Sequence, residues 1–283
     1  MEKADIHNQT GDKPHTPDAS IGTDRTQVST QAEQAGSPTV CRLRLGHVDS
    51  TNNFLRQNPP ATQARVTIVT AEYQTAGRGS ASNKWESAEG QNIVMSLLVH
   101  PTHIPPTQQY QLTEVLALAV REALDTYRQG FVIKWPNDIY YGHKKVVGML
   151  IENRLTSTSI RDCIMGVGIN VNQTRFVSDA PTPSSLALIT GREVDREELL
   201  SRIMDRFQTY YSWTETNRQA DLHELYLQHL YKRDIMAQYE DKDGRFDARI
   251  DTVEPDGHLV MTDSDGRVRR YEFKEVKFCL PNQ

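Results

Sequence analysis

Apolar and polar positions along this chain fall into patterns that predict a sheet covered by helices. Residues 65–74 and 92–99 are mostly apolar and rich in Val, Ile and Leu, which indicates two buried strands joined by a polar, glycine-containing loop. Residues 107–128 place apolar side chains on one helical stripe: Leu112, Leu116, Ala119, Ala123 and Tyr127. We therefore expect a helix here that packs against the sheet.

The pattern continues with more strands and helices. Residues 132–141, 145–154 and 161–172 predict successive strands, so the sheet should be mixed and largely antiparallel. Residues 196–213 and 221–231 return to helical spacing. Beyond residue 232, short alternating runs are separated by Asp-Gly pairs that begin at Asp243, Asp256 and Asp265. Because Asp-Gly favours tight hairpin turns, this segment predicts a small all-β module.

Composition narrows the function classes. Residues 1–39 contain no aromatic residue and many Ser, Thr, Gln, Gly and Pro, so they cannot bury enough surface to fold and are expected to be disordered. The formal net charge of -5 argues against a polyanion as the main partner. No run is long enough to span a membrane, and three scattered cysteines without a secretory signal favour a reducing, cytoplasmic location.

The run Lys-Trp-Pro-Asn-Asp at residues 134–138 is the strongest candidate for chemistry. In its plainest interpretation it is a strand that ends at a turn, since Pro136 forbids helix and Asn137 and Asp138 are common turn residues. The alternative is that Lys134 offers a fixed positive charge at an anion site. Upstream, Gly77, Arg78 and Gly79 follow a predicted strand, and two glycines that flank a guanidinium suit close approach to phosphate or carboxylate.

Together with Trp85, the run 145–148 (Lys-Val-Val-Gly) and the run 168–172 (Gly-Ile-Asn-Val-Asn), these motifs resemble those of the biotin protein ligases in order and spacing. The resemblance covers roughly residues 43–280. It implies an α/β fold, with a class II synthetase-like, mixed and largely antiparallel sheet flanked by helices. The expected division is a tail (1–39), a catalytic domain (40–231) and a Src-homology-3-like β-barrel (232–283).

The resemblance also implies a reaction. Biotin and ATP form biotinyl-5'-AMP, and biotin then passes to a lysine of the biotin carboxyl carrier protein of a carboxylase. Mg²⁺ is expected with the triphosphate. Some members carry an N-terminal winged-helix DNA-binding domain, which the polar tail cannot supply, so we expect the form without it, no nucleic-acid or membrane partner, and a monomer or homodimer.

The resemblance assigns roles to particular residues of this chain. Lys134 and Arg78 are the expected catalytic residues. The expected biotin-binding residues are Ser50, Thr51, Asn52, Gln74, Gly77, Arg78, Trp85 and Lys134. The expected nucleotide-binding residues are Arg78, Gly79, Trp85, Lys134, Asn137, Lys145 and Asn170. Trp135 is a further candidate for an apolar wall, Glu152 for a partner of a cation, and a one-residue slip in register would exchange Lys145 with Lys144.

Two rival functions stay open. A lipoate ligase shares the superfamily fold and the two-step logic, although the run 135–138 and the Asp-Ser-Thr-Asn segment 49–52 favour biotin. A non-catalytic biotin sensor or repressor is the rival of another class. The polar tail and the presence of Lys134 count against it. A phosphate loop of the Gly-x-x-x-x-Gly-Lys-Ser/Thr type does not occur in the sequence, so an ATP site must be of another kind.

The sequence departs from the family at Ser80, where members usually have an arginine that helps to hold the loop over the adenylate. A charged hydrogen bond contributes roughly 1.5–3 kcal/mol, so its loss should speed escape of the intermediate by about ten- to a hundredfold. We expect Ser80→Arg to slow adenylate release and to suppress labelling of bystander lysines while carrier biotinylation continues. Equal dissociation rates for the natural chain and the variant would show that Asn83, Lys84 or a main-chain amide already replaces the missing contact.

Overall fold

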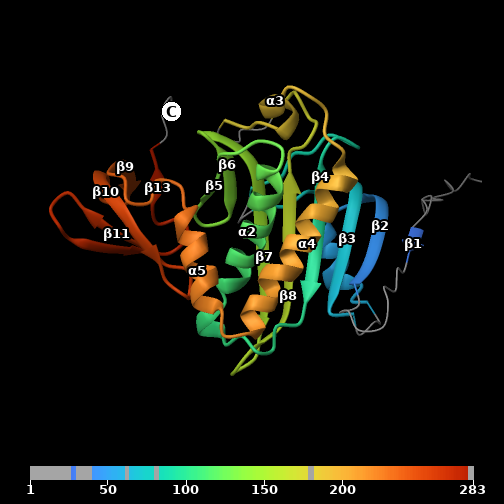
Figure 1. The fold of residues 1–283 in the computed structure, drawn as a ribbon, viewed down its shortest axis with the longest axis horizontal. Helices are drawn as coiled ribbons and strands as arrows, with labels where there is room; N and C mark the ends of the chain where they lie inside the picture. The colour runs from blue at the N-terminus through green and yellow to red at the C-terminus, as the bar shows by residue number, and fades with distance from the viewer. Residues whose placement is uncertain (1–26, 30–39, 61–63, 80–82, 178–181, 280–283) are drawn as a thin grey trace, which may run out of the picture.

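The computed structural model of the protein describes residues 27–29, 40–60, 64–79, 83–177 and 182–279 (Figure 1). Of the predicted tail it describes only strand β1 (Gln27–Ser29), which pairs antiparallel with β2 and which the expectation of disorder did not include. The rest of the tail and Ser80 lie outside the described residues. Among the helices that are described, none has the length and hydropathy of a membrane span.

One large sheet organises the chain. Its eight strands run in the order β1-β2-β3-β4-β8-β7-β6-β5, and β2 with β3 is its parallel pair. The strands are β2 (Val40–Val48), β3 (Val66–Gln74), β4 (Ile93–Val99), β5 (Phe131–Lys134), β6 (Asp138–Tyr141), β7 (Lys144–Leu155) and β8 (Ile160–Ile169). The prediction of a mixed, largely antiparallel sheet is therefore confirmed.

The strand predicted at residues 132–141 is wrong in one respect, because it is a hairpin. β5 ends at Lys134, the chain turns through Trp135, Pro136 and Asn137, and β6 returns antiparallel with Asp138 opposite Lys134. Proline has no N–H to donate to a sheet ladder, so a strand cannot run straight through Pro136. The turn places Lys134 and Asp138 side by side.

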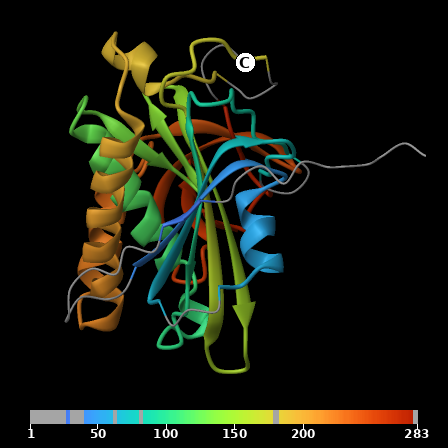
Figure 2. The same cartoon turned by 90° about the vertical axis from the view of Figure 1, so that its right-hand side faces the viewer.

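Helices cover both faces of the sheet. α2 (Gln111–Asp125), α4 (Arg196–Glu215) and α5 (Gln219–Gln228) belong to the large hydrophobic core on one face, and α1 (Thr51–Gln57) closes a smaller core on the other (Figure 2). Two short helices complete the set, the 3-10 helix η1 (Pro106–Gln108) and α3 (Leu186–Thr190). Four members of the predicted stripe, Leu112, Leu116, Ala119 and Ala123, are buried on α2, whereas Tyr127 lies beyond its end and is half-buried; each fully buried leucine contributes roughly 1.5–3 kcal/mol.

Two of the predicted helices have ends that differ from the prediction by a few residues, whereas α4 begins at Arg196 as predicted. The helix expected from residue 107 begins as η1 and becomes α-helical at Gln111. The helix expected to reach residue 231 ends at Gln228, because the following residues pair with β5: Ile133 N donates to His229 O at 2.9 Å and Tyr231 N donates to Ile133 O at 2.8 Å. This pairing extends the edge of the sheet.

The C-terminal segment is all β, as predicted. Its five strands run in the order β12-β11-β10-β9-β13 and comprise β9 (Ala237–Asp241), β10 (Gly244–Val253), β11 (Leu259–Asp263), β12 (Val268–Tyr271) and β13 (Lys277–Phe278). The glycines of the three Asp-Gly turns, Gly244, Gly257 and Gly266, all have positive φ. Glycine adopts that conformation without steric cost, which explains the turn chemistry.

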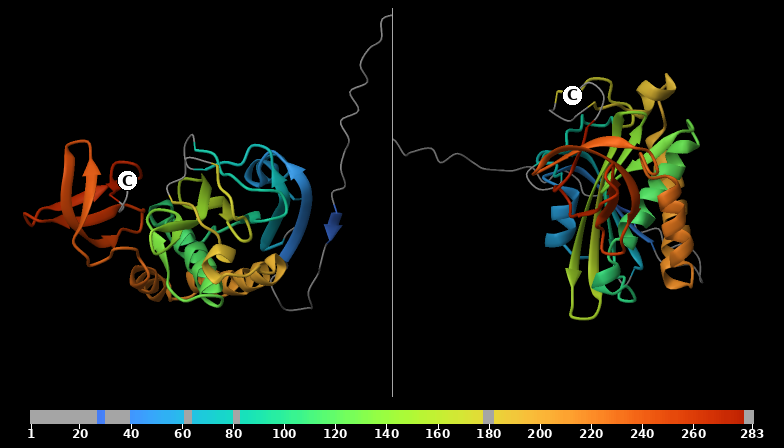
Figure 3. Two further views of the ribbon diagram at one scale, coloured as in Figure 1. Left: turned by 90° about the horizontal axis from the view of Figure 1, so that it is seen from above. Right: turned by 90° about the vertical axis from the view of Figure 1, so that its left-hand side faces the viewer.

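This C-terminal module lies beside the β5 end of the large sheet (Figure 3). Its β10–β11 turn contacts the larger domain through two hydrogen bonds, from Tyr110 N to Pro255 O at 3.2 Å and from Trp135 Nε1 to Gly257 O at 2.9 Å. A Cβ on Gly257 would lie 2.8 Å from the Tyr110 ring. Close packing of the turn against Tyr110 therefore requires glycine at position 257.

We expect Gly257→Ala to destabilise the protein more than Gly244→Ala. Both glycines have positive φ, 104° and 120°, so both substitutions carry backbone strain of order 1–3 kcal/mol. Only the new methyl group at position 257 also meets Tyr110, since nothing lies within 4 Å of a Cβ at position 244. Urea unfolding of the two variants measures the difference, and equal losses would contradict the docking described here.

Candidate functional site

A cavity of about 200 Å³ lies on the α1 face of the large sheet. It brings together residues from α1, the loop after β3, the β5–β6 hairpin, β7 and β8. Ten of the residues predicted from sequence line it: Ser50, Thr51, Asn52, Gln74, Arg78, Gly79, Trp85, Lys134, Asn137 and Lys145. The structure thus gathers segments that are far apart in the chain at one place.

Glycines on neighbouring strands create the floor of the cavity. Gly148 on β7 pairs directly with Gly168 on β8, and a Cβ on either would overlap the Trp85 ring, at 2.7 Å for Gly148. Gly166, two residues before Gly168 and so on the same face, is likewise denied a side chain by Asn52. The large flat indole of Trp85 can therefore lie directly on the backbone of the sheet.

Neutral hydrogen-bonding groups are held where α1 begins. Thr51 donates to Gln74 Oε1 twice, from its N at 2.8 Å and from its Oγ1 at 3.1 Å. Because both donors require an acceptor, the oxygen of the Gln74 amide must face Thr51, and its nitrogen points toward Gly77. Ser50 precedes the helix as its N-cap residue, but its side chain makes no capping bond and lines the cavity.

Ser96, a buried residue of β4, forms hydrogen bonds with the polar side chains at the start of α1. Its hydroxyl lies 2.7 Å from Thr51 Oγ1 and 2.5 Å from Asn52 Oδ1. Asn52 is 3% exposed, and its Nδ2 donates to Glu152 Oε2 at 2.8 Å and to Leu150 O at 3.3 Å. The polar side chains at the start of α1 are thus oriented by the sheet before any ligand arrives.

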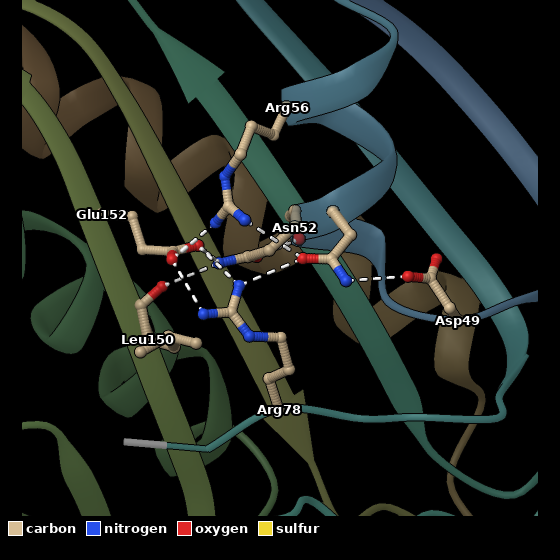
Figure 4. Close-up of polar contacts among 8 residues, drawn as sticks. Asp49, Asn52, Arg56, Arg78, Leu150 and Glu152 are labelled. Carbon is tan, nitrogen blue, oxygen red and sulfur yellow. Dashed lines mark hydrogen bonds and ion pairs between the residues drawn. The ribbon is translucent and has the colours of Figure 1, made fainter. Parts of the chain in front are cut away.

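Arg78 is held by Glu152 on β7 (Figure 4). Its Nη2 lies 3.1 Å from Glu152 Oε1, and its Nη1 donates to Asn53 Oδ1 at 3.1 Å. Arg56 on α1 approaches the same carboxylate at 2.6 Å, so Glu152 joins two guanidinium groups. The sequence indicates Glu152 as a partner of a cation, and the structure pairs it with Arg78 rather than with Lys134 or Lys145.

Two lysines occupy the β5–β7 side of the cavity. Lys145 Nζ lies 2.7 Å from Asp138 Oδ1, and neighbouring Lys144 points into solvent, which settles the register. Burial lowers the pKa of Lys134; Asp138 opposes this effect, and Lys145 and Lys232 add to it. A desolvated ammonium group near other cations is a strong attractor for an anion.

Three predicted residues are placed differently. Gly77 and Asn170 do not line the cavity: Gly77 O accepts from Trp85 N at 2.9 Å, and Asn170 is 4% exposed and donates to Ser184 O at 3.0 Å. The Asn170 Oδ1 atom is buried without a hydrogen-bond partner among the described residues. Trp135 is not a cavity wall either, because its indole is buried against the C-terminal module.

Sequence reasoning missed several cavity residues. Gly148 and Gly168 belong to motifs of the sequence, and the alternation of Gly166 and Gly168 along one strand is the signal that a flat, hollow face lies there. Asp138 also belonged to a motif. Phe273, by contrast, comes from the C-terminal module, and nothing local in the sequence places its ring at the cavity.

In the C-terminal module, Glu254, Asp256 and His258 each place one possible metal-ligand atom within 4.8 Å of the others. Arg270 already pairs with both carboxylates, at 2.5 Å and 2.9 Å. The cluster is therefore charge-compensated and lies apart from the cavity lining.

Comparison with known proteins finds similar sequences and structures. The profile of the biotin/lipoate A/B protein ligase family matches residues 46–170. The bifunctional ligase/repressor BirA of Bacillus spizizenii is 40% identical over 152 residues, which are 51% of this chain and 46% of that protein. The biotin--[acetyl-CoA-carboxylase] ligase of Paracoccus denitrificans is 28% identical, covering 65% of this chain and 78% of that protein. The chain spans about half the length of the BirA relatives it matches.

Solved structures agree with the sequence comparison. A biotin protein ligase from Aquifex aeolicus, in complex with biotin and ATP, has a TM-score of 0.69 at 26% identity and covers 84% of this chain and 99% of that chain. The Leishmania major biotin protein ligase with biotinyl-5-AMP, at 23% identity and a TM-score of 0.56, supports the fold alone. In sequence and in fold the chain is similar to the biotin protein ligases, and residues 46–170 match the profile of the biotin/lipoate A/B protein ligase family.

Proposed function

We propose that this protein is an ATP-dependent biotin protein ligase. In the first step the biotin carboxylate attacks the α-phosphorus of ATP, forms biotinyl-5'-AMP and releases pyrophosphate. In the second step the amino group of a carrier-protein lysine attacks the acyl carbon, loses a proton and releases AMP. Named biotin ligases among the relatives, and a solved relative in complex with biotin and ATP, support this proposal.

The observation that carries the proposal is the contrast between the two sides of the cavity. Neutral donors and acceptors come from α1 and β3, and positive charge comes from Lys134 and Lys145 on β5 and β7. β3 and β7 are separated by β4 and β8, so these sides lie roughly 15 Å apart at the usual strand spacing. This arrangement suits an elongated ligand with a polar neutral ring at one end and a carboxylate at the other, as in biotin.

The charged residues have distinct roles in this proposal. Two anions, the biotin carboxylate and the triphosphate, must be held together against their repulsion. Lys134 neutralises charge that develops between the carboxylate and the α-phosphate, and Lys145 faces the phosphates that leave. Arg78, oriented by Glu152, supplies planar donors to the same anions.

The remaining parts of the proposal concern the nucleotide. Trp85 offers an aromatic face, and Asn137 lines the cavity next to the lysines. Asn170 lies behind the lining, so its unpartnered Oδ1 accepts a hydrogen bond from the adenine amino group only if the residues that cover it move when the nucleotide binds. ATP is proposed to enter as its Mg²⁺ complex, since Mg²⁺ commonly binds through phosphates, water and one or two carboxylates, and Asp138 is the carboxylate among the described lining residues.

The rival ligand fits this cavity less well. The dithiolane ring of lipoate is apolar and would cover the Ser50 hydroxyl and the Gln74 amide nitrogen, for which the described residues offer no hydrogen-bond partner, and this desolvation is costly. A non-catalytic biotin sensor would have no need of the cations Arg78, Lys134 and Lys145 that line the cavity. The specific carrier, a cytoplasmic location, the boundaries at residues 39 and 231, and a monomeric or dimeric state remain predictions from the sequence.

We expect Lys134→Ala to slow biotin-dependent exchange between pyrophosphate and ATP by at least about a hundredfold, because loss of a preorganised charge contact commonly costs about 2.7–4 kcal/mol of barrier. The matched control is Lys144→Ala, which removes an exposed lysine beside Lys145 and should leave the rate unchanged. A near-normal single-turnover rate for Lys134→Ala at saturating substrates would refute its assignment. Exchange that depends on lipoate, or no exchange at all, would favour one of the rivals.

We expect Ser96→Ala to weaken biotin binding by roughly five- to fifteenfold, since one buried hydrogen bond contributes about 1–1.5 kcal/mol, while the KM for ATP stays the same. Thr214→Ala is the control, because it removes another buried hydroxyl from α4 on the opposite face of the sheet. Calorimetric titration with biotin measures the effect. Unchanged biotin affinity would show that α1 orients Thr51 and Asn52 without help from β4.

A further inference from the structure

The environment of the Lys134 ammonium group includes a ring from outside the larger domain. Its Nζ lies 4.4 Å from the centroid of Phe278 and 5.4 Å from that of Tyr140. Tyr140 belongs to β6, next to the hairpin turn, whereas Phe278 belongs to β13, the last strand of the C-terminal module. No described residue forms a hydrogen bond or ion pair with this Nζ, in contrast to Lys145, which pairs with Asp138. The faces of two aromatic rings are therefore close contacts that stabilise its charged form.

The position of Phe278 is fixed by its neighbours. The ring is 8% exposed and lies between Tyr231, with centroids 6.3 Å apart, and Tyr239, at 5.1 Å. Tyr231 is in turn tied to the strand that carries Lys134, because its N donates to Ile133 O at 2.8 Å. Tyr231 thus contacts both Phe278 and the strand that carries Lys134. This shared contact fixes the position of the ring relative to the ammonium group.

We propose that Phe278 is a positioning residue for Lys134, through which the C-terminal module sets the place and the charge of the ammonium group in the proposed adenylation site. The inference rests on the proposed function for the meaning of that charge, and the contact itself stands on geometry. A cation that is desolvated by burial loses stability unless something nearby favours the charged form. The ring supplies that preference without binding the ammonium as a carboxylate would, so Lys134 stays available to substrate anions.

The direction of the effect follows from the groups around Lys134. Burial, Lys145 on β7 and Lys232 after α5 lower its pKa, and Asp138 on β6 raises it. Replacing Phe278 by leucine keeps an apolar surface but removes the ring face, so the charged form loses support and the pKa of Lys134 falls further. A cation–π contact of typical strength corresponds to about 0.4–1.5 pH units. Lys134 must be charged to act, so the alkaline limb of the reaction should move to lower pH.

The experiment uses the full-length protein labelled with ¹³C at lysine Cε, with Lys134 assigned by its absence from a Lys134→Arg spectrum. In the unsubstituted protein the Cε protons of Lys134 should be shifted upfield by the ring current, compared with exposed Lys144. Titration should give a pKa lower by about 0.4–1.5 units in Phe278→Leu and restored in Phe278→Tyr. Phe246→Leu is the matched control, because that ring also has a cation over it, Arg269 at 4.3 Å, but within the module.

The alkaline limb of kcat/KM for ATP in biotin-dependent exchange should follow the titration. An unshifted or raised pKa in Phe278→Leu, an equal shift in Phe246→Leu, or normal Cε proton shifts for Lys134 would overturn the proposal. The last observation needs no variant, so it stands even if Phe278→Leu fails to fold. A pKa that moves while the alkaline limb does not would also overturn it. Absence of exchange in the unsubstituted protein would instead refute the proposed function, and the titration would still test the contact.

Discussion

The register between β7 and β8 is the constraint on which the site depends. Gly148 faces Gly168, and Leu150 faces Gly166, so one face of these two strands is nearly free of side chains. Because side chains alternate along a strand, a slip of one residue in one strand would turn Met149 or Val167 of the core toward the site. Trp85 could then not lie on the sheet, and the loop that carries Arg78 would lose its support. The cavity is thus a consequence of strand pairing.

Charge is distributed around this hollow in an ordered way. Glu152 holds two guanidinium groups, Asp138 holds Lys145, and Lys134 is left among aromatic rings. Arg78, Lys145 and Lys134 are each oriented by a neighbour, and the lining contains more positive than negative groups. An anion that enters therefore meets groups already in position, which spares the cost of reorganising them.

The C-terminal module belongs to the same arrangement. Trp135, next to Lys134 in sequence, turns its indole to the module and donates to Gly257 O, so one dipeptide serves both the proposed chemistry and the docking. Phe273 and Phe278 return from the module toward the cavity and toward Lys134. Because Trp135 contacts the module and Phe273 and Phe278 of the module contact the site, the C-terminal module contributes to a cavity that is built mainly on the large sheet.

The sequence by itself determined four strands of the large sheet (β3, β4, β7 and β8), the long helices, the all-β character of the C-terminal segment and ten of the residues that line the cavity, since apolar period, Asp-Gly turns and short glycine-rich or lysine-containing motifs are local signals. Only the tertiary structure decided that Trp135 faces the module, that Asn170 and Gly77 lie behind the lining, that Glu152 pairs with Arg78, and that Phe278 reaches Lys134. Each of these depends on which segments, distant in the chain, come to lie side by side. Local patterns specify the conformation of a segment but carry no information about its distant neighbours, and packing supplies that part.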